Sequence, residues 1–219
     1  MKIGTDGVLL GAWASIENQP KDILDIGTGT GIIALQLAQR SSANRIDALE
    51  IDKNAFDQCT GNFKNSPWND RLHCFHSSFQ HFLKEEKNLY DLIVSNPPFY
   101  REDYSSGNEK RDLARFSSSI TFEELLKGTA QLLSERGIFS TIIPKSRETE
   151  FTQLASTEKL HLQKRTKVRG NKNSKIKRSL LQFGFEKTTL FSNQLIVEHA
   201  RHEYTEEYRA LVEDFYLKM

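Results

Sequence analysis

The chain has 219 residues, of which 37% are hydrophobic, and its formal net charge is +1. No apolar run reaches the length needed to span a bilayer, and the 2 cysteines form neither a metal-ligand spacing nor a disulfide framework. We therefore expect one soluble, cytoplasmic domain over residues 1–219, without a metal site and without a membrane partner.

The first segment, residues 2–14, joins a polar loop carrying Asp6 to an apolar stretch that can open a helix. The apolar part is a poor match to a signal peptide, because it is short, follows an acid and lacks a convincing cleavage site. A strand is predicted over residues 21–26, and the turn Gly-Thr-Gly-Thr-Gly over residues 27–31 leads into a helix over residues 32–40.

This glycine turn suits a ligand site, because glycines let the backbone approach a ligand and the next helix N-terminus offers unpaired N–H groups. The third glycine of a dinucleotide fingerprint would fall at Ile32, which argues against a nicotinamide or flavin cofactor. The next strand, residues 45–51, carries Glu50 roughly twenty residues past the turn, where an acid can accept hydrogen bonds from ribose hydroxyls. Asp52 is the alternative for that role, and a solvated acid at a strand end is the interpretation without a ligand.

A helical pattern over residues 54–63 is followed by strand patterns over residues 72–77 and 90–95. Strands that alternate with helices of this length indicate βαβ units. The sequence therefore predicts an α/β fold with a doubly wound, mostly parallel sheet.

The stretch from Asp91 to Phe99 is an apolar strand that breaks into Asn96, two prolines and an aromatic residue. In an open α/β sheet, the carboxyl edge of the strands is where ligands bind. The prolines leave the carbonyls of Asn96 and Pro97 free to accept hydrogen bonds, and Phe99 offers a flat apolar face. An exocyclic NH₂ on an aromatic ring fits this combination, although Asn-Pro-Pro alone is only a turn.

The next segment, residues 100–119, is a long charged loop that contains Tyr100, Arg111 and Arg115. We interpret it as a lid on the substrate side, with a disordered surface insertion as the alternative. A capping box at Thr121 opens the following helix.

The remaining elements close the sheet. Residues 160–169, 178–186 and 194–199 alternate like antiparallel strands, so the predicted seven-stranded sheet ends in an antiparallel edge. A last amphipathic helix over residues 206–217 carries an apolar stripe that we expect in the core. Also expected are a fifth strand over residues 137–144 and a helix over residues 148–156.

The segment over residues 164–178 forms a basic hairpin without any acid. Such a run predicts contacts with nucleic-acid phosphates, and a solvated face is the alternative. Its basic residues are Lys164, Arg165, Lys167, Arg169, Lys172, Lys175, Lys177 and Arg178.

Taken together, the glycine turn, the acid after the second strand and Asn96-Pro-Pro-Phe99 resemble Rossmann-like methyltransferases that use S-adenosylmethionine. The opening Thr5-Asp6-Gly-Val-Leu-Leu-Gly-Ala-Trp, Arg111-x-x-Ala-Arg115, the basic hairpin and the C-terminal Asp214-Phe-Tyr-Leu-Lys-Met extend the resemblance over nearly the whole chain. They are similar to the bacterial tRNA1(Val) (adenine-N6)-methyltransferase family, whose reaction is methylation of the adenine just 3′ of the anticodon.

The resemblance implies roles for the motif residues. Asn96 and Pro97 would hold the target N6 amine, and Phe99 would stack on the flipped base. Ser78 stands where such enzymes often carry an acid that contacts the cofactor adenine, and members usually have residues ahead of the position matched by Met1. The cofactor residues implied are Asp6, Asp25, Gly27, Gly29, Gly31, Glu50, Ser78 and Asn96.

We expect direct in-line methyl transfer, which needs no catalytic His or Cys, so His73, His76 and His81 are interpreted as surface or packing residues. Three alternatives remain: methylation of a glutamine amide in a translation factor, methylation of an rRNA adenine, and a non-catalytic RNA-binding protein with a relic cofactor pocket. The partner expected is tRNA, and a monomer is favoured over a dimer.

Overall fold

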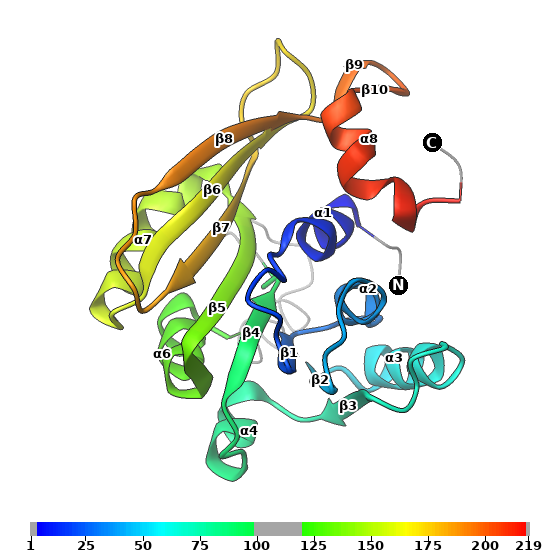
Figure 1. The fold of residues 1–219 in the computed structure, drawn as a ribbon, viewed down its shortest axis with the longest axis vertical. Helices are drawn as coiled ribbons and strands as arrows, with labels where there is room; N and C mark the ends of the chain where they lie inside the picture. The colour runs from blue at the N-terminus through cyan, green and yellow to red at the C-terminus, as the bar shows by residue number, and fades with distance from the viewer. Residues whose placement is uncertain (1–3, 99–119, 218–219) are drawn as a thin grey trace, which may run out of the picture.

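The computed structural model describes residues 4–98 and 120–217. Eight strands form one sheet in the order β3-β2-β1-β4-β5-β7-β6-β8, and a small β9–β10 hairpin lies beyond it (Figure 1). The strands are β1 (Asp22–Ile26), β2 (Arg45–Glu50), β3 (Leu72–His76), β4 (Tyr90–Ser95), β5 (Leu133–Pro144), β6 (His161–Arg169), β7 (Arg178–Gly184), β8 (Phe191–Ile196), β9 (Glu198–Ala200) and β10 (Glu203–Tyr204). The helices are α1 (Thr5–Trp13), α2 (Ile32–Arg40), α3 (Lys53–Lys64), α4 (Phe79–Glu85), α6 (Phe122–Leu132), α7 (Glu148–Thr157) and α8 (Glu206–Val212), with short 3₁₀ turns at Lys145–Arg147 and Glu213–Phe215.

The first five strands are parallel to one another, which confirms the doubly wound sheet. Strand β5 pairs with β7 in antiparallel fashion on its other side. Their apolar runs are buried because helices cover both faces of the sheet. In β4, for example, Leu92, Ile93 and Val94 are all fully buried.

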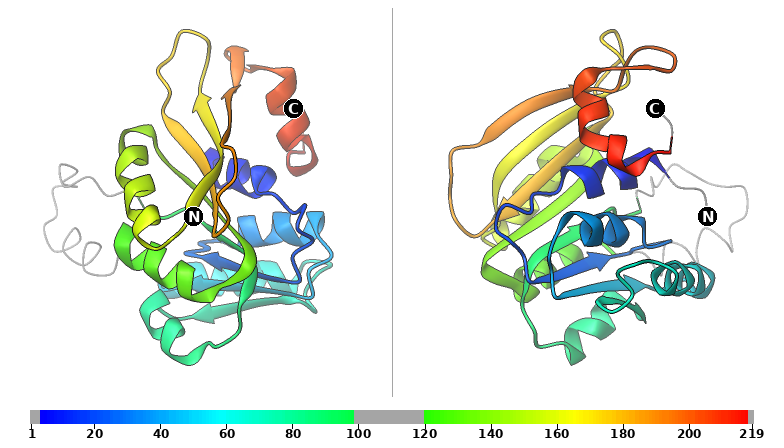
Figure 2. Two further views of the ribbon diagram at one scale, coloured as in Figure 1. Left: turned by 60° about the vertical axis from the view of Figure 1, so that its left-hand side comes forward. Right: turned by 45° about the vertical axis from the view of Figure 1, so that its right-hand side comes forward.

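Each face of the sheet has its own set of helices (Figure 2). Buried side chains of α1, α2, α3 and α8 form one core cluster with residues of the sheet, and those of α4, α6 and α7 form the other. The apolar stripe of the last helix lies in the first cluster as expected: Tyr208 and Val212 are buried, and Leu211 and Phe215 pack against them.

The eight strands of the sheet correspond to the eight strand ranges predicted one by one, so the stated total of seven was one too few. The last strand differs from the prediction. The strand near residues 194–199 lies earlier, at Phe191–Ile196, and it pairs with β6 in parallel instead of antiparallel fashion. Strand β8 lies on the outer side of β6, so β6 separates it from β7, the strand that precedes it in the chain. Alternation along a strand reports which face is buried and carries no information about the neighbouring strand, so the pattern could not give this direction. Helix α4 was not predicted; it is short and begins at the N-cap Ser78.

Helix α1 joins the first and last parts of the chain. The indole Nε1 of Trp13 donates to Thr166 Oγ1 of β6 at 2.8 Å, and Asp6 forms an ion pair with Arg178 at the start of β7 at 2.7 Å. Helix α8 packs against the same cluster of buried side chains. No helix in residues 4–98 or 120–217 is long and apolar enough to cross a membrane.

Strand β4 is anchored at its first residue by a buried polar network. The hydroxyl of Tyr90, which is fully buried, donates to Asp47 Oδ2 at 2.7 Å, and Arg45 forms an ion pair with the same carboxylate. Burial raises the pKa of Asp47, and the two donors oppose that shift.

We expect Tyr90→Phe to lower the free energy of unfolding by about 1–3 kcal/mol, because a buried carboxylate loses a donor while the ring packing is kept. Urea denaturation with an unchanged m-value would measure the loss. Tyr204→Phe is the control, since this half-buried hydroxyl makes no hydrogen bond within the described residues, and an equal loss in both variants would contradict the role of the Asp47 contact.

Candidate active site

Four strands end side by side at the edge of the sheet where the candidate residues lie. Ile26 at the end of β1 is in register with Leu49 of β2 and with Ser95 of β4, and Glu50 is in register with His76 of β3. Parallel strands with this register deliver the residues that follow them to one place. The glycine turn, Glu50 and Asn96, which are far apart in the sequence, therefore meet at this edge.

The glycine turn is held against the end of β2 by its own backbone. The N–H groups of Gly27 and Thr28 both donate to the carbonyl of Leu49, at 3.0 and 2.9 Å. Gly31 has φ of +85°, and a Cβ there would come within 2.6 Å of Phe63 and 2.9 Å of Cys59, so only glycine fits. Gly27 also has a positive φ, but the space beside its Cα is open.

Glu50 lies directly against this turn. Its Oε2 accepts from Gly29 N at 2.8 Å, and its Oε1 accepts from Asp52 N at 2.8 Å. The alternative to Glu50, Asp52, caps helix α3 by accepting from Ala55 N. Glu50 is the acid that the fold places at the turn, whereas Asp52 is used by its own helix.

Asp25 lies beneath the glycine turn and is fully buried. Its Oδ2 accepts from the hydroxyl of Thr28 at 2.6 Å, whereas Oδ1 has no partner within the described residues. Burial raises the pKa of this carboxyl from 3.8 to about 7, and the Thr28 hydrogen bond opposes the shift. A donor from a bound ligand would satisfy the open oxygen and favour the ionised form.

Asn96 follows β4 at the same edge and is half-buried, and Pro97 after it is buried. The preceding Ser95 is fixed, since its hydroxyl donates to the carbonyl of Ile26 at 2.9 Å. Within residues 4–98 and 120–217, no hydrogen bond engages the Asn96 side chain. The strand therefore positions the amide at the carboxyl edge of the sheet. Four further candidates, Phe99, Tyr100, Arg111 and Arg115, lie outside the described residues, as does the lid expected over residues 100–119.

Ser78 and Asp6 are both engaged with other protein groups. Ser78 caps α4 by accepting from His81 N, and its neighbour Ser77 donates its N–H to the carbonyl of Glu50, so Ser78 lies at the site edge. Asp6, in the first turn of α1, is held by Arg178. We expected Asp6 to contact the cofactor and Arg178 to contact RNA. In the structure, the charges of these two side chains neutralise each other.

Several basic residues of the hairpin are engaged in contacts within the protein. Lys164 lies over the ring of Trp13 at 4.6 Å, and burial lowers the pKa of its amine. Arg165 forms an ion pair with the buried Glu148 at 2.9 Å. Arg169 donates to the carbonyl of Lys172 and to Gln194. These contacts make the strands of the hairpin part of the fold.

The turn between β6 and β7 presents its cations differently. Lys172, Lys175 and Lys177 are exposed, and they form no ion pair within the described residues, whereas Lys167 on the strand is half-buried. Arg178 at the base of this turn pairs with Pro144 at the end of β5, so the turn projects from the same edge as Asn96.

Sequence reasoning did not single out Thr28 or Ile51. Thr28 holds the buried carboxylate of Asp25, and its position within the glycine turn was the available signal. Ile51, directly after Glu50, is 48% exposed at the site edge, which is unusual for a large apolar side chain. An apolar residue directly after a strand-end acid could have indicated a face for an aromatic ring.

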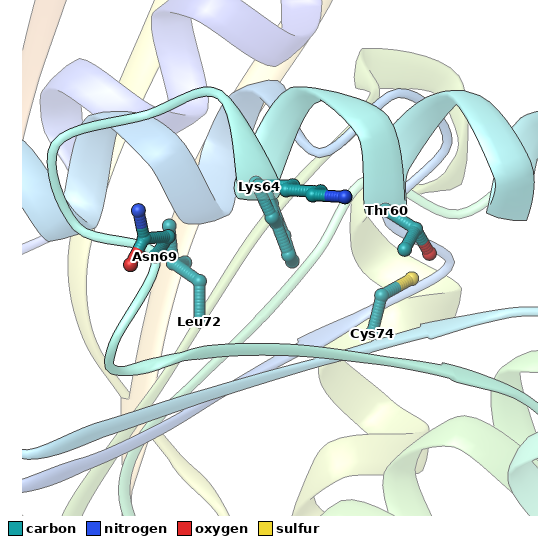
Figure 3. Close-up of a pocket in the computed structure, with 6 residues that line it drawn as sticks. Thr60, Lys64, Asn69, Leu72 and Cys74 are labelled. Atoms are coloured by element: carbon teal, nitrogen blue, oxygen red, sulfur yellow. The ribbon is translucent and has the colours of Figure 1, made fainter.

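A cavity of about 480 Å³ lies elsewhere, between α3 and β3 (Figure 3). It is lined by Thr60, Phe63, Lys64, Asn69, Leu72 and Cys74, none of which is a candidate site residue. Among the residues that the structure describes, no group of three or more His, Cys, Asp or Glu side chains could hold a metal ion.

The strand-end residues fit S-adenosylmethionine. Open space beside Gly27 and the unpartnered Oδ1 of Asp25 suit the amino-acid part of that molecule, and Glu50 suits a ribose. The N-cap of α2 is Gly31, which offers no capping side chain, and the N–H of Ala34 in the first turn donates to the Asp25 carboxyl. The N-terminal end of a helix favours a negative group such as a ligand carboxylate.

Comparison with known proteins shows the family of the chain. The model of the methyltransferase small domain family matches residues 8–168. Proteins called tRNA1(Val) (adenine(37)-N6)-methyltransferase are similar over the full chain: one from Christiangramia forsetii is 54% identical, with 92% of its length covered. One from Flavobacterium psychrophilum is 55% identical (94% covered), and one from Escherichia fergusonii is 36% identical (89% covered).

Two solved structures support the fold. A "predicted O-methyltransferase" from Agrobacterium tumefaciens has a TM-score of 0.73 at 14% identity and covers 95% of this chain and 96% of its own. A putative RNA methyltransferase from Pyrococcus horikoshii has a TM-score of 0.54 at 15% identity, with 75% and 74% covered. With full-length identity of this kind, the chain belongs to the tRNA1(Val) (adenine(37)-N6)-methyltransferase family, whose methyl donor is S-adenosylmethionine.

Proposed function

We propose that this enzyme transfers a methyl group from S-adenosylmethionine to N6 of adenine 37 in tRNA1(Val), in the cytoplasm. The observation that carries the proposal is the half-buried Asn96 amide, which no described residue engages, at the strand edge beside the glycine turn. The names of the full-length relatives supply the nucleic acid and the position.

The chain's own residues divide the work of binding the cofactor. Asp25 and the glycine turn hold the methionine part, Glu50 accepts from the ribose hydroxyls, and Ile51 offers an apolar face to the adenine. Ser78 retains a hydroxyl proton to donate, because its oxygen acts only as an acceptor in the α4 cap. When bound, S-adenosylmethionine supplies an already activated methyl group, so these residues need only align it.

Asn96 and Pro97 act on the target amine. The lone pair of an aromatic exocyclic amine is delocalised into its ring. The side-chain oxygen of Asn96 and the Pro97 carbonyl accept hydrogen bonds from the two N–H groups of this amine. These contacts favour a pyramidal nitrogen whose lone pair faces the methyl group. The product cation loses its proton readily, so no general base is required before transfer.

The exposed lysines at the β6–β7 turn contact RNA phosphates, which position the substrate without reading its sequence. Lys164, Arg165 and Arg178 contribute mainly by holding the hairpin, because each of them has a partner within the protein. A glutamine amide in a translation factor is the remaining alternative substrate, since it also presents a planar NH₂ group.

The direct test is transfer of labelled methyl from S-adenosylmethionine to unmodified tRNA1(Val), followed by nucleoside analysis. We expect N6-methyladenosine at position 37 and loss of the signal after RNase treatment. Label that survives RNase and appears in protein would support the amide substrate and reject the proposal.

Asn96→Ala should lower kcat on the order of 10²-fold or more and leave the Kd for S-adenosylmethionine nearly unchanged, because the lost contact is made in the transition state. Single-turnover kinetics and calorimetry would measure the two quantities. Asn88→Ala is the control, because Asn88 is exposed and lies just before the opposite end of the same strand. Parallel losses in binding and turnover would reject the assignment.

Glu50→Gln should weaken cofactor binding by about tenfold or more, since a charge-assisted hydrogen bond is lost while the side-chain shape is kept. Calorimetric titration with S-adenosylmethionine would measure the Kd. Asp70→Asn, at an exposed acid away from the site, serves as the control. Equal Kd values for the two variants would remove Glu50 from the ribose site.

Asp25 should make the ligand-free protein less stable as pH rises from about 4 to about 7, because its folded-state pKa is about 7 and the ordinary value is 3.8. Asp25→Asn removes this titration. We therefore expect the variant to have a higher Tm than the wild type at pH 8, with the difference shrinking toward pH 4.5, and to bind S-adenosylmethionine more weakly. Melting curves at both pH values would test this, and a Tm difference independent of pH would contradict it.

A further inference from the structure

We propose that the β9–β10 turn is a second phosphate-binding arm, which acts together with the β6–β7 turn on one RNA strand. The turn is centred on Arg201 and His202, in a segment to which no function has been assigned. This inference rests on the RNA substrate proposed above and names how that substrate is held.

The two turns are joined at their bases. Strand β8 runs beside β6 with Ile196 in register with Arg169, and the pairing continues beyond the end of the strand. Val197 N donates to the carbonyl of Arg169 at 3.0 Å, and Glu198 N donates to the carbonyl of Gly170 at 2.8 Å. Both turns therefore leave the sheet together, and all the views show them projecting from the same end (Figures 1 and 2).

This end of the sheet is also the edge that carries Asn96. Thr141 of β5 is in register with Ser95, and three residues later Pro144 is in register with Arg178. Strand β7 is the second strand from β4 and β8 is the fourth, so their lateral distances from β4 are roughly 10 Å and 20 Å at ordinary strand spacing. An RNA stem that places one nucleotide at Asn96 would bring nearby phosphates to the two turns.

The β6–β7 turn is held rigidly by its own hydrogen bonds. Asn173 N donates to the side chain of Asn171, Ser174 N donates to the carbonyl of Asn171, and Arg169 donates to the carbonyl of Lys172. A turn fixed in this way presents Lys172 and Lys175 at little entropic cost on binding.

The β9–β10 turn faces solvent with one arginine, Arg201, which lies in the sequence between two acids, Glu198 and Glu203. Arg201 and His202 are exposed, and Arg201 forms no ion pair within the described residues. The carboxylate of Glu198 accepts from His202 N at 3.3 Å, so this acid is partly used by the turn itself. Glu203, two residues after Arg201, is also exposed, and its negative charge repels an approaching phosphate. Removal of this charge should therefore have the opposite effect on RNA binding from removal of the Arg201 charge.

The test measures the affinity of the full chain for unmodified tRNA1(Val) at several salt concentrations. Arg201→Gln should weaken binding several-fold and reduce the slope of log K against log [salt] by about 1, the value for one lost phosphate contact. Glu203→Gln should tighten binding, an effect that damage to the fold does not produce. The Kd for S-adenosylmethionine should stay unchanged in both variants.

Lys187→Gln is the matched control. It removes one exposed positive charge from the loop between β7 and β8, at the opposite edge of the sheet, and should leave the slope unchanged. If Arg201→Gln and Lys187→Gln behave alike while the wild type binds and methylates tRNA, the second arm is rejected and the proposed function stands. If the wild type neither binds nor methylates tRNA, both are overturned.

Discussion

The hydrogen bond from Gly29 N to the Glu50 carboxylate is the constraint on which the site depends. It ties the turn after β1 to the last residue of β2, and the Leu49 carbonyl accepts two more hydrogen bonds from the same turn. A glycine turn with positive φ angles has many conformations available when it is free. Tied at three points to the neighbouring strand, it becomes a fixed surface, and the end of β4 is placed relative to it by the sheet.

Asp25 shows that this arrangement costs stability. A buried carboxylate with one unpartnered oxygen is unfavourable in the ligand-free protein, and its raised pKa reports that cost. Residues in such a state are expected where a ligand completes the hydrogen bonding. The same burial that penalises the ionised carboxylate strengthens its contact with a bound donor, because the local dielectric is low.

The sequence was sufficient for most elements of the parallel half of the sheet, because apolar runs, glycine turns and caps are local signals. The adjacency of Glu50 and the glycine turn also followed, since parallel strands end at a common edge. The parallel partner of β8 could not be predicted, because it depends on which strand is already paired. The distinction between Arg165, which is held by Glu148, and Lys172, which faces solvent, was likewise out of reach, as charge alone does not reveal a partner.

The position of α1 has a consequence for synthesis of the chain. Helix α2, which follows α1 closely in the chain, supplies one set of neighbours, since Gln36 and Arg40 donate to backbone carbonyls of α1. Its other anchors are Thr166 of β6, Arg178 of β7 and the core side chains of α8, all of which leave the ribosome long after α1 itself. The side of α1 that carries Trp13 must therefore wait for more than half of the polypeptide before it finds its permanent neighbours. Nascent chains that stop short of the last strands would keep Trp13 exposed, which makes them recognisable to chaperones and proteases as unfinished.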